Sequence, residues 1–164
     1  MMRTTFSLIC LLAALFGLTA CQSAPEPAPD PEVPRSAVLQ GAGFVQSSEG
    51  WEFSTSEKLL FEYNASSLVP AGRETVVRIA QLLMKLEVPA VRIDGHTDAT
   101  GSVDYNNQLS LLRAQAVADV MMETGMPAAA ITVRGLGSQA PVASNQTAEG
   151  RAQNRRVVVV IVGN

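Results

Sequence analysis

The stretch "DGHTDATGSVDYNNQLSLLRA", residues 94–114, decides how the chain folds, because it joins a strand pattern to a helix pattern. The residues that lead into it, "AVRIDGH" at 90–96, alternate with the period of two that is typical of a half-buried strand. Gly101 marks a tight polar loop, and Ser102 can cap a helix over 103–125. The stretch therefore predicts a strand, a loop and a helix in direct succession.

Within this stretch, one acid and one base are placed to meet a ligand. Asp98 falls on the predicted loop, and Arg113 falls about three turns into the predicted helix. Asn106 precedes Arg113 by about two turns and shares its side of the helix. Free N–H groups at a helix start favour an anion, and a guanidinium binds both oxygens of a carboxylate. The pattern predicts a site for a zwitterion, although a salt bridge between Asp98 and Arg113 would also fit the spacing.

The flanking sequence extends the strand and helix pattern in both directions. It predicts strands at 58–63, 130–137 and 155–162, a helix at 71–87, and a polar loop at 137–153. The second helix should bury a stripe made of Leu109, Leu112, Ala116 and Val120. The fold class is α/β: a two-layer sandwich of βαβαββ order, with two main helices packed on one face of a mixed four-stranded sheet.

The N-terminus carries the features of an export signal. Residues 1–20 combine Arg3, an apolar run and small residues at the end. The run is short for a bilayer span, which needs about 20 residues. The ending "LTAC" resembles the lipobox of bacterial lipoproteins, which implies that Cys21 is lipidated and becomes the first residue. Gln22 stands where an Asp would imply retention at the inner membrane, so the resemblance implies the outer membrane.

Two segments separate Cys21 from the predicted domain at 58–164. Residues 21–37 are rich in Pro and acidic residues and are expected to form an extended tether that reaches about 50 Å. Residues 38–57 are interrupted by glycines and contain Phe44 and the single Trp, Trp51. These two aromatic residues have two interpretations. They pack the segment onto the domain, or they form a latch that a partner releases.

Composition narrows the classes of function. The chain has 12 basic and 15 acidic residues, and Arg3 belongs to the predicted signal, so the exported chain carries about four net negative charges. This excess of acid argues against nucleic acid as a partner. No nucleophile elbow occurs, and the only His, His96, has no second imidazole for a metal site. We expect no enzyme activity, no cofactor and no metal.

Several motifs resemble the C-terminal domain family of OmpA, Pal and MotB. They are "LLFEYNASSL", "GHTDATGS", "YNNQLSLLRAQAV" and "GLGSQAPVASNQTAEGRAQNRRV", in this order over 58–162. The resemblance implies noncovalent binding of peptidoglycan through the diaminopimelate of its stem peptide. It implies that Asp98 takes the ligand's ammonium group and that Arg113 takes its carboxylate. Further residues implied to line or shape the pocket are Glu62, Thr97, Asn106, Leu109 and Arg155. Of these, Glu62 departs from the Asp that many members have.

The segment before the domain narrows the resemblance. "GFVQSSEGWEF" and "GMPAAAITVRGLG", together with the short leader, resemble the YfiB-type lipoproteins of Gram-negative bacteria. This resemblance implies a signalling role, in which the N-terminal region sequesters a small periplasmic repressor and so frees a diguanylate cyclase. A purely structural anchor between outer membrane and cell wall is the alternative.

Overall fold

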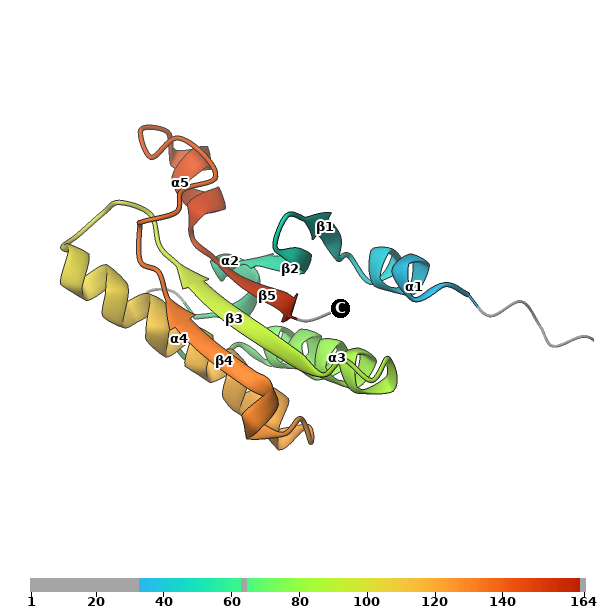
Figure 1. Cartoon of the computed structure of the whole chain (residues 1–164). Helices are drawn as coiled ribbons and strands as arrows, with labels where there is room; N and C mark the ends of the chain where they lie inside the picture. The colour runs from blue at the N-terminus through green and yellow to red at the C-terminus, as the bar shows by residue number, and fades with distance from the viewer. Residues whose placement is uncertain (1–32, 63–64, 163–164) are drawn as a thin grey trace, which may run out of the picture. The chain divides into compact units, whose positions relative to one another are not determined.

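A mixed five-stranded sheet, with helices α3 and α4 packed on one of its faces, forms the centre of the domain (Figure 1). The computed structural model describes residues 33–62 and 65–162. The predicted signal, Cys21 and the tether up to residue 32 lie outside the described residues. The elements are α1 Arg35–Gly41, β1 Val45–Ser47, β2 Gly50–Ser56, α2 Glu57–Leu60, α3 Pro70–Lys85, β3 Ala90–His96, α4 Val103–Glu123, a 3₁₀ turn at Ala128–Ala130, β4 Ile131–Gly135, α5 Ala148–Asn154 and β5 Arg156–Val162.

The strand order is β1-β2-β5-β3-β4, in which only the β3–β4 pair is parallel. Strand β5 lies in the middle, and its apolar run fits that place, since a central strand buries residues on both of its faces. Val157, Val159 and Ile161 belong to the core that the helices cover. The predicted α/β class, the mixed sheet and the helices on one face are confirmed, but the sheet has five strands rather than four.

The strand predicted at 58–63 is wrong. Strand β2 occupies the sheet position beside β5 instead, and the chain then turns through the short helix α2. Leu60 and Phe61, which are adjacent in sequence, are both buried, whereas Leu59 is exposed. Adjacent buried residues do not fit the alternation of a half-buried strand. Leu60 and Phe61 therefore enter the core from a turn between β2 and α3.

Helix α4 lies against the sheet because two glycines leave room for it. Gly95 and Gly135 are paired in register on β3 and β4. A Cβ atom on Gly95 would stand 2.0 Å from the carbonyl oxygen of Ser110, and one on Gly135 would stand 2.6 Å from the backbone nitrogen of Leu111. This close approach fixes the first half of α4 over the carboxyl ends of the two strands.

The predicted helix at 103–125 and its cap are confirmed, because Ser102 accepts a hydrogen bond from the backbone N–H of Tyr105 and the helix ends near Gly125. The predicted apolar stripe is wrong in the first half of the helix. Leu112 is 49% exposed, while Asn106 and Arg113 are buried. The reason is that this half of the helix turns its polar side toward the cavity described below.

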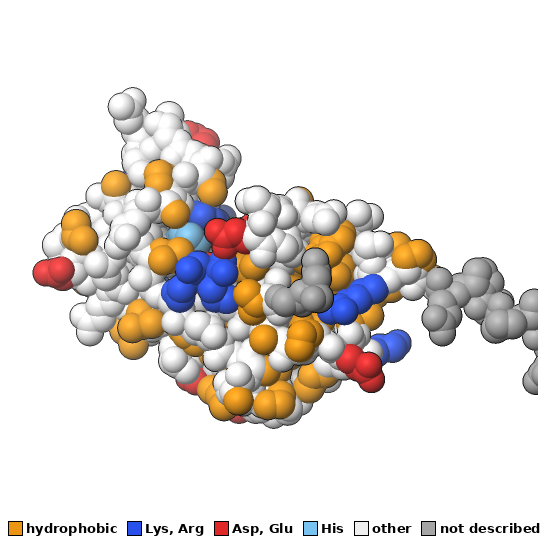
Figure 2. Space-filling view, in the orientation of Figure 1, with side chains coloured by type: hydrophobic (Ala, Val, Ile, Leu, Met, Phe, Trp, Pro, Cys, Tyr) orange, Lys and Arg blue, Asp and Glu red, His pale blue; other side chains and the backbone are white. Residues whose placement is uncertain are grey.

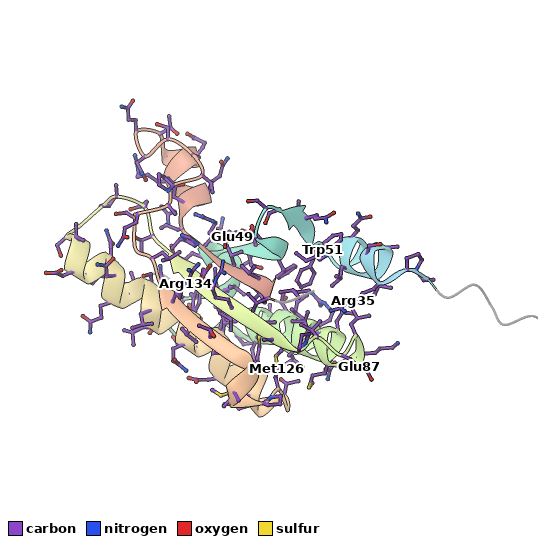
Figure 3. All side chains as sticks on the ribbon, viewed as in Figure 1. Arg35, Glu49, Trp51, Glu87, Met126 and Arg134 are labelled. Atoms are coloured by element: carbon purple, nitrogen blue, oxygen red, sulfur yellow. The ribbon has the colours of Figure 1, made fainter. Side chains whose placement is uncertain are left out.

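The N-terminal segment is part of the folded domain. Helix α1 begins at Arg35, so the predicted extended tether does not continue to residue 37. Leu39 is 1% exposed and Phe44 is 2% exposed, and the ring of Phe44 lies 5.4 Å from that of Phe53. Trp51, on β2, packs against the same core (Figure 3). Both aromatic residues therefore pack the segment onto the domain, and a latch function stays a prediction.

The predicted polar loop at 137–153 contains the short helix α5. Thr147 caps α5 by accepting a hydrogen bond from the backbone N–H of Gly150 at 3.0 Å. Among residues 33–62 and 65–162, no helix has the length and apolar character that crossing a membrane requires.

Candidate functional site

A cavity of about 980 Å³ opens where the end of β2, the loop after β3, the start of α4 and helix α5 meet. All seven residues predicted for the site line this cavity. They are Glu62, Thr97, Asp98, Asn106, Leu109, Arg113 and Arg155. Arg156, next to Arg155, lines a different cavity on the opposite face of the sheet. Of these two adjacent arginines, only Arg155 therefore lines the candidate site.

Arg113 is held rigidly at the base of the cavity. Only 3% of the residue is exposed, and its guanidinium carbon lies 5.4 Å from the ring centre of Phe61. Its Nε donates to the carbonyl oxygen of Ala65 at 3.0 Å, and its Nη2 donates to Oε1 of Glu57 at 2.6 Å. A buried guanidinium costs several kcal/mol unless it is paired, so these contacts hold its charge in place.

Asp98 is held on the loop that follows β3. Its Oδ1 accepts from the backbone N–H of Thr100 at 2.8 Å, and its Oδ2 accepts from Nη1 of Arg155 at 2.7 Å. Burial disfavours the ionised carboxyl, but the bonds from Arg155 and Thr100 outweigh it and lower the pKa of Asp98 below its ordinary value. The same bond raises the pKa of Arg155. Asp98 is therefore a carboxylate at neutral pH.

Asn106 shapes the loop rather than offering its amide to solvent. Its Nδ2 donates to the carbonyl oxygens of Asp98 at 3.3 Å and Thr100 at 3.0 Å. The neighbouring Thr97 is buried, and within the described part of the chain its hydroxyl has no hydrogen-bond partner. The Thr97 hydroxyl is thus a buried polar group beside the cavity that no described protein group satisfies.

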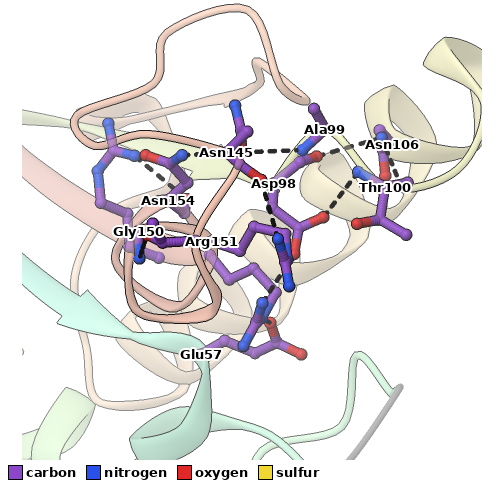
Figure 4. A network of polar contacts seen from close by, with 12 residues as sticks. Glu57, Asp98, Ala99, Thr100, Asn106, Asn145, Gly150, Arg151 and Asn154 are labelled. Carbon is purple, nitrogen blue, oxygen red and sulfur yellow. Dashed lines mark hydrogen bonds and ion pairs between the residues drawn. The ribbon is translucent and has the colours of Figure 1, made fainter.

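A network of amide side chains joins two loops beside the cavity (Figure 4). Asn154 is fully buried, and its Oδ1 accepts from the backbone N–H groups of Val142 and Ala143. Its Nδ2 donates to Oδ1 of Asn145 at 2.9 Å, and that oxygen also accepts from the backbone N–H of Ala99 at 3.2 Å. The network ties the loop before α5 to the loop that carries Asp98.

Sequence reasoning missed three charged residues of the cavity. These are Glu57, Lys58 and Arg151. Glu57 follows directly after β2, and placing the first strand at 58–63 hid its position at a strand end. Arg151 lies on α5, where the sequence predicts a polar loop, so its side chain could not be placed. For both residues, the missing information was the path of the backbone, since neither stands in a pattern that signals a ligand.

The arrangement of charges suits a ligand that carries both signs. Arg113 offers a buried cation on one side, and Asp98 offers a buried anion on the other. The cavity is lined by four basic side chains, Lys58, Arg113, Arg151 and Arg155, and by three acidic ones, Glu57, Glu62 and Asp98. The excess of one positive charge favours a ligand with at least one carboxylate.

A second cluster of charged side chains lies on the face of the sheet opposite the helices (Figure 2). Asp94 accepts from Arg134 at 2.7 Å on both carboxylate oxygens, and it also accepts from Nε of Arg92. Glu49 pairs with Arg92, and Glu49 and Arg134 lie along the same face (Figure 3). His96, at the end of β3, is 6% exposed, and burial lowers the pKa of its imidazole to about 4.

Known proteins resemble this chain in sequence and in fold. The model of the OmpA family matches residues 60–155. The chain belongs to the OmpA family. It is 45% identical to the outer-membrane lipoprotein YfiB of Pseudomonas aeruginosa over 153 residues, which cover 93% of this chain and 90% of that protein. This similarity confirms the resemblance to YfiB-type lipoproteins.

Two further similar proteins have names that refer to peptidoglycan. The chain is 43% identical to the peptidoglycan-binding protein ArfA of Mycobacterium tuberculosis over 107 residues, which cover 65% of this chain and 33% of that protein. The crystal structure of the peptidoglycan-associated lipoprotein from Burkholderia pseudomallei superposes with a TM-score of 0.56 at 29% identity, covering 62% of this chain and 86% of that one. The OmpA-family domain therefore has the fold predicted from the sequence.

Proposed function

We propose that this OmpA-family protein is an outer-membrane lipoprotein whose domain binds peptidoglycan noncovalently. Lipid on Cys21 holds the chain in the membrane, and the domain faces the periplasm. The ligand is the diaminopimelate of the stem peptide. Its ammonium group binds Asp98, and its carboxylate binds Arg113. The process is recognition without turnover.

One observation carries the proposal: a buried acid and a buried base line the same cavity from different elements. A zwitterion that spans the cavity can pair with both Asp98 and Arg113. A simple anion or cation can pair with only one of these two side chains. Asn106 and the amide network support the proposal because they fix the loop that carries Asp98.

The test is sedimentation of the chain from Gln22 onward with isolated peptidoglycan sacculi. This chain keeps α1, whose Leu39 belongs to the core. Asp98→Ala and Arg113→Ala should each weaken binding by about 30-fold or more, since removing one side of a buried charge pair typically costs 2–5 kcal/mol. Arg113→Lys should restore only part of the binding, because an ammonium lacks the two-pronged guanidinium.

Matched controls are available on the protein surface. Asp119→Ala and Arg78→Ala remove the same charges from exposed positions outside the cavity, and both should pellet like the wild type. Thermal unfolding checks that each variant is folded. If folded Asp98→Ala and Arg113→Ala variants still pellet like the wild type, the site is assigned wrongly.

A second candidate function adds signalling through a small periplasmic repressor, whose capture would free a diguanylate cyclase. The similarity to YfiB covers 93% of the chain, so it includes α1, β1 and β2, which precede the part matched by the OmpA family. Phe44 is buried, and a partner could reach it only after the segment leaves the sheet. This arrangement supports a latch made of residues 38–57.

The latch is tested in cells by the level of cyclic-di-GMP. Phe44→Ala should loosen the segment and raise that level when the repressor is present. Leu83→Ala is the matched control, because it removes a fully buried side chain from α3, outside the segment. Equal cyclic-di-GMP in both variants and in the wild type would leave the structural anchor as the better explanation.

A further inference from the structure

Arg113 and Asp98, the two side chains that we propose bind the ligand, are already paired with other side chains of the protein. Nη2 of Arg113 lies 2.6 Å from Oε1 of Glu57. Nη1 of Arg155 lies 2.7 Å from Oδ2 of Asp98. Nε of Arg155 also lies 2.8 Å from Oε2 of Glu57, close enough for an ion pair although the hydrogen-bond geometry is not met. The four side chains thus form a row of alternating charges: Arg113, Glu57, Arg155 and Asp98.

Glu57 and Arg155 belong together in the backbone as well as in the row. Glu57 is the first residue of α2, directly after β2, and Arg155 directly precedes β5. The backbone N–H of Glu57 donates to the carbonyl oxygen of Arg155 at 2.9 Å. The Glu57 side chain is 16% exposed and that of Arg155 is 37% exposed, so both are closer to solvent than Arg113. Glu57 and Asp98 are seen in the same network in Figure 4.

We propose that Glu57 and Arg155 form an internal substitute for the ligand, with the same two charges in the same two places. The Glu57 carboxylate pairs with Arg113 where the ligand's carboxylate would bind, and the Arg155 guanidinium pairs with Asp98 where the ligand's ammonium group would bind. Binding is then an exchange of partners: the ligand's carboxylate replaces Glu57, and its ammonium group replaces Arg155. This inference rests on the proposed function and names the residues that compete with the ligand.

The exchange keeps every charge paired. A guanidinium as buried as that of Arg113 needs a partner, because an unpaired buried charge is strongly destabilising. When the ligand takes Arg113 and Asp98, the released Glu57 and Arg155 still face one another through the contact at 2.8 Å. Each of the four charged side chains in the row therefore has an oppositely charged partner both before and after binding.

The exchange also gives the site a preference for zwitterions. A ligand with a carboxylate alone displaces Glu57 from Arg113 but leaves Arg155 paired with Asp98. The new ion pair between ligand and Arg113 then replaces the lost ion pair between Glu57 and Arg113. A ligand with both charges displaces the whole internal pair. Glu57 therefore lowers the affinity for every carboxylate and lowers it most for ligands that cannot also engage Asp98.

The experiment measures the affinity of the chain from Gln22 onward, which contains the whole compact unit Val33–Asn164, for a soluble muropeptide that carries diaminopimelate. Titration calorimetry gives the dissociation constant, and sedimentation with sacculi repeats the comparison on intact wall. Glu57→Gln removes the competing charge with little change of shape. It should bind on the order of 10-fold more tightly, because a neutral amide competes for Arg113 less strongly than a carboxylate does.

A second acidic variant and a distant control make the result specific. Glu57→Asp keeps the charge but shortens the side chain, so its affinity should lie between the wild type and Glu57→Gln. Glu74→Gln makes the same change of net charge at an exposed position on α3, outside the cavity, and should bind like the wild type. Thermal unfolding with and without muropeptide shows that all three variants are folded.

The outcomes distinguish failure of the partner exchange from failure of the proposed peptidoglycan binding. If Glu57 merely positions Arg113, Glu57→Gln binds more weakly than the wild type, and the inference is overturned while the proposed function stands. Unchanged affinity in Glu57→Gln overturns it as well. If neither the wild type nor Arg113→Ala binds the muropeptide or the sacculi, the proposed function falls and the exchange falls with it.

Discussion

We expect the single histidine, His96, to make the stability of this domain depend on pH. His96 is 6% exposed at the end of β3. Burial lowers the pKa of its imidazole from 6.5 to about 4, and Arg156 on β5 and Arg134 on β4 add to the effect, while Asp94 on its own strand opposes it. The folded protein therefore resists protonation that the unfolded chain accepts.

The sign and size of the effect follow from this difference. Between pH 6.5 and about 4, the unfolded chain binds one more proton than the folded domain, so stability is complete above pH 6.5 and falls as the pH is lowered. Each pH unit in this range costs about 1.4 kcal/mol. Lowering the pH from about 7.5 to about 5 should therefore reduce the free energy of unfolding by about 2 kcal/mol.

Urea denaturation at several pH values, followed by Trp51 fluorescence, measures this loss. The chain has one histidine, so His96→Gln removes the imidazole titration completely. Its free energy of unfolding should be nearly constant between about pH 7.5 and about 5, whatever the substitution costs at neutral pH. The pKa values of Asp94 and Asp98 are lowered from 3.8, so these carboxyls lose protons well below this window. Equal pH dependence in wild type and His96→Gln would show that the reasoning about His96 is wrong.

Two further predictions concern the packing that positions the site, and both are measured by urea denaturation at neutral pH. Gly95→Ala should lower the free energy of unfolding by about 3 kcal/mol or more, because its Cβ would stand 2.0 Å from the carbonyl oxygen of Ser110. Gly41→Ala, where a Cβ meets nothing within 4 Å, should change it by less than about 0.5 kcal/mol. Leu39→Ala should cost about 2–5 kcal/mol, because α1 is part of the core; a change below about 0.5 kcal/mol would mean that the segment is not packed in solution.

The sequence predicted most of the domain because its strong patterns are local. The alternation over 90–96, the Ser102 cap and the apolar run after Arg156 each determine their element without help from distant residues. The weak point was β2, whose sequence "GWEFSTS" has few apolar residues. It becomes a strand because it pairs with β5, and tertiary pairing of this kind overrides local preference.

The same division holds for the candidate site. Asp98 and Arg113 could be predicted because they stand in one continuous stretch, on a loop and on the helix that follows it. Glu57 could not, because it reaches Arg113 across 56 positions of sequence, through the pairing of β2 with β5. The predicted apolar stripe of α4 is wrong for a related reason. A helix that faces a polar cavity buries its polar side, so hydrophobic periodicity predicts the wrong buried face.

This limit has a physical origin that bears on how the site works. A residue that binds a ligand through a buried charge needs a partner at all times, because several kcal/mol are lost whenever that charge is left bare. Sequence motifs record the residues that face the ligand, whereas the partner that serves in its place can come from any element that reaches the cavity. For Arg113 that partner is Glu57, and for Asp98 it is Arg155. The affinity for the wall is then the difference between two sets of ion pairs, so it depends on Glu57 as directly as on Arg113.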